Sequence, residues 1–151
     1  MQLGHKVCNV CGVEKPVEAF PNRRGSTCRV CHGKLQRERH GRSPETWCTY
    51  LVKQAKSNAR KTEREFDITG EQVHELWKRQ GGLCALTHLP MQHHPAYSDM
   101  NASIDRIDGS VGYVIDNVQL VCWRVNEMKN DQAEHQLIWW ARVLVANDEK
   151  H

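Results

Sequence analysis

The apolar positions in the middle of the chain recur with the period of an α-helix. Ser43 followed by Pro44 is typical of a helix start. The residues at helical spacing after this start are Trp47, Leu51, Ala55 and Asn58. Cys48, on the same helix, is expected to be a buried small hydrophobic residue. The segment therefore predicts an amphipathic helix with one apolar stripe.

A second helix is predicted to begin after Thr69, because Thr69 and Gln72 have the spacing of a capping box. Gly81 and Gly82 are expected to end this helix. Its buried face is predicted to consist of Val73, Leu76 and Trp77.

A strongly apolar last helix is predicted over residues 136–145, after Asp131 and Glu134 at capping-box spacing. Trp139 and Trp140 are expected to lie mainly in the hydrophobic core, with a dimer contact as the alternative for one of them. No internal repeat or low-complexity segment interrupts these patterns.

The spacing of apolar residues changes several times within the short stretch between residues 103 and 130. Ile104 and Ile107 indicate one short strand, and the apolar run 118–121 indicates another. A helical pattern follows from about Trp123. This stretch therefore predicts a strand, a loop, a second strand and a helix in close succession.

Two polar side chains of this stretch can converge. Asp105 lies on the first of these strands, and Asn126 lies on the helix. Two oxygen-bearing side chains that meet from a strand and a helix provide ligands that a hard divalent cation needs. The stretch is therefore more typical of a metal-dependent phosphodiester-cutting site than of an ordinary surface.

The length and the charge refine this picture. The 151 residues allow one modest domain with an appended module. Residues 1–64 contain fourteen Lys and Arg against five Asp and Glu, whereas residues 65–151 contain seven against thirteen. A basic anchor followed by an acidic metal site is the arrangement expected of a nuclease. The alternative is a basic surface that only aids solubility.

Four of the seven cysteines form two C-x2-C pairs: Cys8, Cys11, Cys28 and Cys31. Each pair can place two thiolates on one side of a tetrahedral ion. The residues between the pairs are rich in turn formers, so a metal rather than a core is expected to hold the segment together. We predict one structural Zn²⁺ per chain.

Basic residues surround the cysteine array and continue on the helix that follows. Near the array they are Arg23, Arg24, Arg29, Lys34 and Arg37, and on the helix they are Lys53, Lys56 and Arg60. These side chains can bind DNA phosphates or reach base edges. A solvated amphipathic helix is the alternative interpretation of the helical set.

A recognisable pattern runs from Ile104 to Lys129. Its members are Asp105, Arg106, Gly112, Tyr113, Asn117, Leu120, Cys122, Asn126 and Lys129. This run resembles the motif of HNH endonucleases, which have the ββα-metal fold. The segments LTHLPM and FDIT resemble phage-type enzymes of this family. The CxxC pairs, with KPVEAF between them, resemble the zinc module of PacI-like and endonuclease VII-related enzymes.

The resemblance implies roles for four residues. Asp105 and Asn126 would bind a catalytic Mg²⁺ or Mn²⁺, and Asn117 would hold the loop by hydrogen bonds. Arg106 occupies the position of the histidine that serves as general base in many HNH enzymes. Arginine stays protonated at physiological pH. Arg106 is therefore expected to contact the scissile phosphate or stabilise its developing charge.

The general base must then come from elsewhere in the chain. His93 and His94 are the first candidates, His88 is the next, and Tyr113 is less favoured. A neutral imidazole titrates near the working pH and therefore suits this role.

Cys84 and Cys122 stand where related enzymes often carry further CxxC pairs, but each lacks its second cysteine. We expect both to be packed residues. A degenerate zinc site with His88 as a third ligand is the alternative.

Together these features predict an α+β protein with a small ββα-metal core, flanking helices and an N-terminal zinc module with four cysteine ligands. The expected divisions are residues 1–42 for the zinc module, 43–82 for the basic and second helices, and 83–151 for the catalytic region. We expect a DNA endonuclease that nicks or cuts double-stranded DNA as a monomer or homodimer. It would act in the cytoplasm of a bacterial or phage-infected host cell, without a membrane partner. The alternatives are a non-catalytic zinc-dependent DNA-binding protein and a branched-DNA resolvase.

Overall fold

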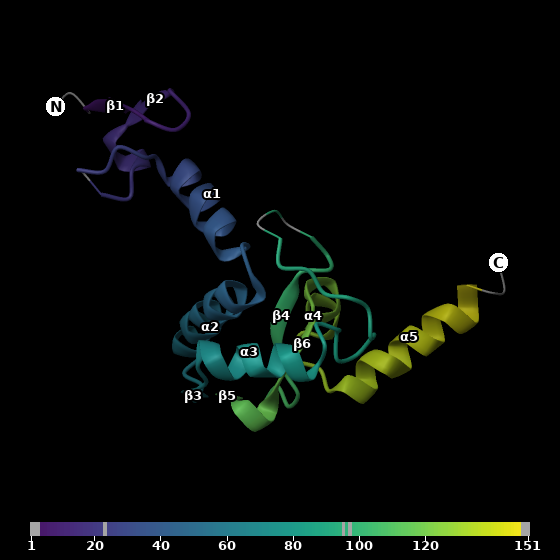
Figure 1. Cartoon of the computed structure of the whole chain (residues 1–151). Helices are drawn as coiled ribbons and strands as arrows, with labels where there is room; N and C mark the ends of the chain where they lie inside the picture. Colours follow the sequence, from purple (N-terminus) through teal and green to yellow (C-terminus); the bar gives the residue numbers. More distant parts are fainter. Residues whose placement is uncertain (1–3, 23, 95, 97, 149–151) are drawn as a thin grey trace.

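A computed structural model of the chain describes residues 4–22, 24–94, 96 and 98–148. The helices are α1 (Arg29–His40), α2 (Pro44–Lys61), α3 (Gly70–Arg79), α4 (Trp123–Lys129) and α5 (Glu134–Asp148). The strands are β1 (His5–Val7), β2 (Glu14–Pro16), β3 (Phe66–Asp67), β4 (Ala102–Arg106), β5 (Tyr113–Val114) and β6 (Val118–Cys122). Two 3-10 turns, η1 (Val17–Ala19) and η2 (Ile115–Asn117), complete the elements of the described residues. This mixture of helices and small sheets confirms the α+β class (Figure 1).

The strands of the described residues form three two-stranded sheets. β1 and β2 pair antiparallel, β3 and β5 pair in parallel, and β4 and β6 pair antiparallel. In the last of these sheets Asp105 lies opposite Gln119. α4 follows β6 directly at Trp123. The segment therefore has the strand, strand and helix order that the sequence predicts.

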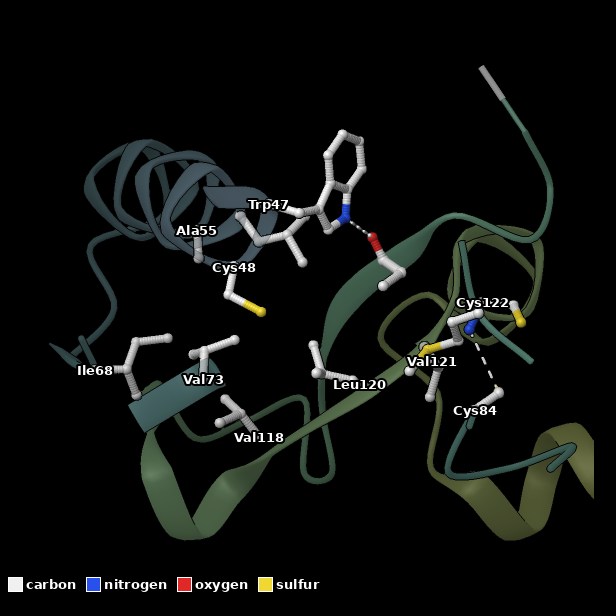
Figure 2. Packing of buried hydrophobic residues seen from close by; sticks show 13 residues of the cluster. Trp47, Cys48, Ala55, Ile68, Val73, Cys84, Val118, Leu120, Val121 and Cys122 are labelled. Carbon is white, nitrogen blue, oxygen red and sulfur yellow. Dashed lines mark hydrogen bonds between the residues drawn. The ribbon is translucent and has the colours of Figure 1, made fainter. Parts of the chain in front are cut away.

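The main hydrophobic core lies where α2 and α3 pack against β4 and β6 (Figure 2). Val73 of α3 and Leu120 of β6 are completely buried in it. The indole N–H of Trp47 donates a hydrogen bond of 3.0 Å to the carbonyl of Ala102. This bond and the surrounding apolar contacts hold α2 against the strand that carries Asp105.

α2 begins where the sequence predicts. The side chain of Ser43 accepts a hydrogen bond of 3.2 Å from the backbone N–H of Thr46 and completes a capping box with that residue. The buried residues of α2 are Trp47, Cys48, Leu51, Ala55 and Ala59. Asn58, expected on the apolar stripe, is exposed. Ala59 takes its place because the stripe continues four residues after Ala55.

α3 also follows its sequence signals. The side chain of Thr69 accepts a hydrogen bond of 3.3 Å from the backbone N–H of Gln72, and the Gln72 amide oxygen accepts one of 2.9 Å from the backbone N–H of Thr69. Gly81 and Gly82 follow the helix with φ angles of 62° and 71°. Such angles favour glycine and end the helix. The residues that face the core are Val73, Leu76 and Trp77.

α5 is the element for which the sequence-based expectation is wrong. It begins at Glu134 instead of residue 136, and it contains no buried residue. Trp139 and Trp140 are 56% and 54% exposed, so they do not lie in the core. The core is already filled by α2 and α3, and α5 extends away from it after a contact with α4 (Figure 1). Like the other described helices, α5 does not reach the length and apolar character needed to cross a membrane.

Candidate active site and metal centre

The paired cysteines of the N-terminal segment converge on one point. The sulfur atoms of Cys8, Cys11, Cys28 and Cys31 all lie within 4.8 Å of one another. Sulfur atoms about 3.8 Å apart are expected around a tetrahedral Zn²⁺ with Zn–S bonds of about 2.3 Å. The cluster can therefore hold a metal such as zinc after a small contraction.

The surroundings of this cluster lower the thiol pKa of Cys8 and Cys28, whereas burial raises the pKa of Cys31 to about 12. Backbone N–H groups, that of Cys28 first and that of Cys11 second, lower the pKa of the Cys8 thiol to about 6. The Lys15 ammonium lies 3.6 Å from the sulfur of Cys28 and supplies a positive charge. Because thiolates are the metal-binding form of cysteine, these contacts prepare the site for a cation.

Asp105 lies on β4 with its carboxylate almost completely buried. Its Oδ1 accepts a hydrogen bond of 2.9 Å from the Lys129 ammonium, and its Oδ2 accepts one of 3.0 Å from the Gln119 amide. A carboxylate offers about four acceptor positions, so two remain after these bonds. Asp105 is therefore fixed in orientation and still able to bind a further partner.

Asn126 lies on α4 and is fastened to the same strand. Its amide nitrogen donates hydrogen bonds of 3.1 Å to the Ser103 hydroxyl and to the Ile104 carbonyl. Its oxygen is the amide atom left for a further partner. Asp105 and Asn126 line one cleft of about 300 Å³. The structure thus brings together the two oxygen-bearing side chains of the predicted pair.

Lys129 forms the part of this site that sequence reasoning missed. It is completely buried, and its ammonium bonds the Asp105 carboxylate and the Arg106 carbonyl at 2.9 Å and 2.8 Å. Buried lysines are rare unless they are paired. Lys129 was a member of the run that resembles the HNH motif, but the sequence gave no sign of its partner.

Asn117 lies in the turn before β6 and closes the loop between the two strands. Its amide nitrogen donates to the carbonyls of Asp108 and Gly112 at 3.1 Å and 3.0 Å. Its oxygen accepts a hydrogen bond of 3.0 Å from the Asp108 backbone N–H. All three bonds are made to the loop backbone, which is the geometry expected of a scaffold residue.

Arg106 follows Asp105 on β4, and its side chain is only 9% exposed. It donates to the backbone carbonyls of Gly109 and Val111 and, at 2.6 Å, to the carboxylate of Asp131. Asp131 had been expected to cap the last helix; instead its Oδ1 bonds Arg106 and lies 3.6 Å from the Arg64 guanidinium. The guanidinium of Arg106 is therefore bound by groups of the chain itself.

A second, larger cleft of about 850 Å³ adjoins the first. Both clefts are lined by Asn58, Ile104, Tyr113, Asn126 and Glu127. Burial raises the pKa of the Tyr113 phenol, and the Arg64 charge offsets part of that rise. Glu127, which had no role in the sequence-based interpretation, is an exposed carboxylate beside the metal-ligand candidate Asn126.

The three candidate histidines lie in different surroundings. His94 is exposed and lines the larger cleft together with Asn126. His93 is turned toward another part of the chain, with its Nδ1 atom 2.9 Å from the Gly41 carbonyl and its ring against Trp77. His88 is exposed in a turn with a φ angle of 57°, and neither cleft includes it. Of the three candidates, His94 is therefore the one that shares a cleft with Asn126.

The predicted DNA-binding residues are spread over the N-terminal segment, α1 and α2. Arg23 lies outside the described residues. Lys34 and Arg37 line the larger cleft, whereas Lys56 lies 5.7 Å from the Phe66 ring centre on the side of α2. The others, all exposed, are Arg24, Arg29, Lys53 and Arg60. Two basic side chains thus border the cleft that leads to the candidate metal site.

Cys84 and Cys122 are packed in the core, as expected. The backbone N–H of Cys122 lies 3.3 Å from the sulfur of Cys84 (Figure 2). In the described part of the chain, the N-terminal four-cysteine set is the group of three or more His, Cys, Asp or Glu side chains placed to hold a metal. The alternative of a degenerate zinc site with His88 gains no support.

Comparison with known proteins adds a distant similarity. A solved structure described as the rare-cutting HNH restriction endonuclease PacI aligns with this chain at a TM-score of 0.46 and 15% identity. The alignment covers 92% of each chain. No protein-family model and no curated protein matches the sequence.

Proposed function

We propose that the chain is a metal-dependent DNA endonuclease of the HNH type. The observation that supports this most is the convergence of Asp105 and Asn126 on one cleft from β4 and α4. The buried Lys129 and the half-buried Gln119 orient the carboxylate, and the Asn117 hydrogen bonds hold the intervening loop. Such support of ligand side chains is typical of a site in which their placement matters.

The residues of the cleft suit a magnesium or manganese ion. Asp105 and Asn126 offer a carboxylate and an amide oxygen, the hard ligands that these ions prefer, with water to complete the coordination. When bound, the ion would stabilise the developing negative charge on the phosphate and on the leaving oxygen. Zinc in the four-cysteine cluster would have a structural role only.

The chain's own residues would prepare and carry out the reaction. The zinc module of residues 1–42 and the basic side chains of α1 and α2 would bind the DNA backbone. Lys34 and Arg37, at the larger cleft, would direct the strand toward Asp105. The attacking water would give its proton to His94, form a bond to phosphorus and displace the 3′ oxygen of the preceding nucleotide. A site of this kind cuts one strand, so a monomer would nick and a symmetric dimer would cut both strands.

A non-catalytic DNA-binding protein is the second candidate. It is favoured by the engagement of Arg106 with Asp131 and the loop carbonyls, where an HNH enzyme often has a free histidine. Under this alternative, Asp105 and Lys129 would form a structural ion pair without a cation.

Incubation of supercoiled plasmid with Mg²⁺ or Mn²⁺ distinguishes the two functions. We expect conversion to nicked or linear DNA that EDTA prevents, with end mapping to give the sequence preference. A four-way junction cut faster than linear duplex would change the substrate to branched DNA. Binding of DNA without any cleavage in either metal would favour the non-catalytic function.

A further inference from the structure

Asp131 places a carboxylate between two arginines at the edge of the smaller cleft. Its Oδ1 atom is 2.6 Å from Arg106 Nη2 and 3.6 Å from Arg64 Nη1. Asp131 itself lines that cleft, together with Asp105 and Asn126. One oxygen placed between two guanidinium groups makes the contact that a phosphate oxygen would also make.

The backbone of Asp131 is held in place, whereas its side chain can change conformation. The backbone is held, because a Cβ atom on Gly109 would lie 2.8 Å from the Asp131 carbonyl oxygen, so the loop and the turn touch closely. The side chain, in contrast, is 62% exposed. A rotation of this side chain would leave the turn in place and free the Arg106 Nη2 and Arg64 Nη1 atoms that it now contacts.

The ion pair of Asp131 with Arg64 is the weaker of its two and costs little to exchange. An exposed ion pair such as Arg64 with Asp131 contributes about 0–1 kcal/mol. A phosphodiester offers several acceptor oxygens and can bind two guanidinium groups at once. The same rotation would free Arg106 Nη2, while the bonds from Nη1 to the Gly109 and Val111 carbonyls would keep the guanidinium in place.

We infer that Arg64 and Arg106 form a binding subsite for a backbone phosphate of nucleic acid, and that Asp131 occupies it as an internal carboxylate until the phosphate arrives. Asp131 would then weaken binding of DNA that lacks a phosphate at this position and admit the strand only when one is presented. Arg64 thereby gains a role that the sequence did not suggest. This inference rests on the proposed function, since the ligand is the DNA that the chain would cut.

Inorganic phosphate tests this subsite without DNA cleavage. The full chain, loaded with zinc, is titrated with phosphate while the Nε–Hε resonances of Arg64 and Arg106 are followed by NMR. We expect both resonances to move together, and the apparent affinity to rise about three- to tenfold in Asp131→Asn, as removal of one close opposing charge predicts. Asp116→Asn, an exposed acid that lines neither cleft, is the matched control and should leave the affinity nearly unchanged.

Two results would overturn the inference. One is the absence of shifts at these arginines, and the other is an equal or smaller gain in Asp131→Asn than in Asp116→Asn. If Asp131→Asn fails to fold, Arg64→Gln decides: it must weaken phosphate binding more than Arg79→Gln at the end of α3. A plasmid assay on the same wild-type sample reports separately whether the chain is a nuclease, so the two proposals can fail independently.

Discussion

The N-terminal segment and the β4–β6–α4 element are held together in different ways. The N-terminal segment buries only Cys8, Phe20 and Cys28 as its hydrophobic cluster among the described residues, and two of these are members of the metal-ligand set. The β4–β6–α4 element shares a core of thirteen buried residues with α2 and α3. We therefore expect metal coordination to stabilise the first region, whereas apolar burial stabilises the second.

The polar centres of the two regions differ as well. In the first, four sulfur atoms lie close enough to one another to hold a cation. In the second, the Asp105 carboxylate already has a buried cation partner in Lys129. We therefore expect the first site to depend on its metal for structure, and the second to fold without one and bind its metal for chemistry.

Removal of the structural metal should produce the largest difference in stability between the two regions. Binding of structural zinc contributes about 10–16 kcal/mol to the folding of small modules. We therefore expect a strong chelator, or Cys28→Ser, to unfold residues 4–28 and to weaken DNA binding, while the near-UV signal of the Trp47 core persists. Amide hydrogen exchange can follow the two regions separately. Simultaneous loss of protection in both would contradict the claim that only the N-terminal segment depends on metal for its structure.

Loss of the Lys129 ammonium should be the next largest change. Lys129→Met leaves the buried Asp105 carboxylate without its cation, and removal of one partner of such a pair costs about 3–5 kcal/mol. We expect a lower denaturation midpoint for the main core and an unchanged zinc content. Lys78→Met is the control, because Lys78 pairs with Glu75 on the exposed face of α3. Equal stability of the two variants would rule out a structural role for the buried pair.

Leu120→Ala tests the difference between the two regions by removing apolar contacts from the main core and leaving all charges unchanged. Leu120 is fully buried in the main core, and such truncations cost about 2–5 kcal/mol. Urea denaturation should show this loss, and cadmium or zinc binding by the four cysteines should be unaffected. A change in the metal affinity of the cysteines would show that the two regions are coupled.

The smallest predicted effect concerns the start of α2. Ser43→Ala removes the capping box and should cost about 1 kcal/mol of stability. Ser43→Asp retains a side-chain acceptor and should restore most of it. Thermal denaturation of the three proteins measures the difference, and a loss in both variants would indicate that the cap is not the cause.

Local signals in the sequence predicted the local parts of the fold. The capping box of Thr69 and the helix start at Ser43 marked α3 and α2 because cap and helix are neighbours in the chain. The convergence of Asp105 and Asn126 was also predictable, since a short strand–strand–helix segment leaves few ways to arrange them.

Long-range partners could not be predicted in the same way. The contact of Lys129 with Asp105 spans 24 residues, and that of Asp131 with Arg106 spans 25. Neither contact leaves a periodic pattern in the sequence. Asp131 was therefore assigned to a helix cap from its spacing to Glu134 alone. The exposure of Trp139 and Trp140 was missed for a related reason. An apolar sequence indicates side chains that gain from burial, but it does not show whether the hydrophobic core can accommodate them.

Single-turnover cleavage of supercoiled plasmid by the wild-type chain and by Asp105→Asn is the decisive test of the proposed nuclease site. With Mg²⁺ or Mn²⁺, the wild type should nick the plasmid, and Asp105→Asn should be slower by about a thousandfold or more, as expected when a metal ligand is lost. DNA affinity measured without added Mg²⁺ or Mn²⁺ should be equal for the two proteins, and Asp116→Asn should cleave at the wild-type rate. Cleavage by Asp105→Asn at the wild-type rate, or no cleavage by the wild type in either metal, would contradict the assignment of this cleft as a nuclease site.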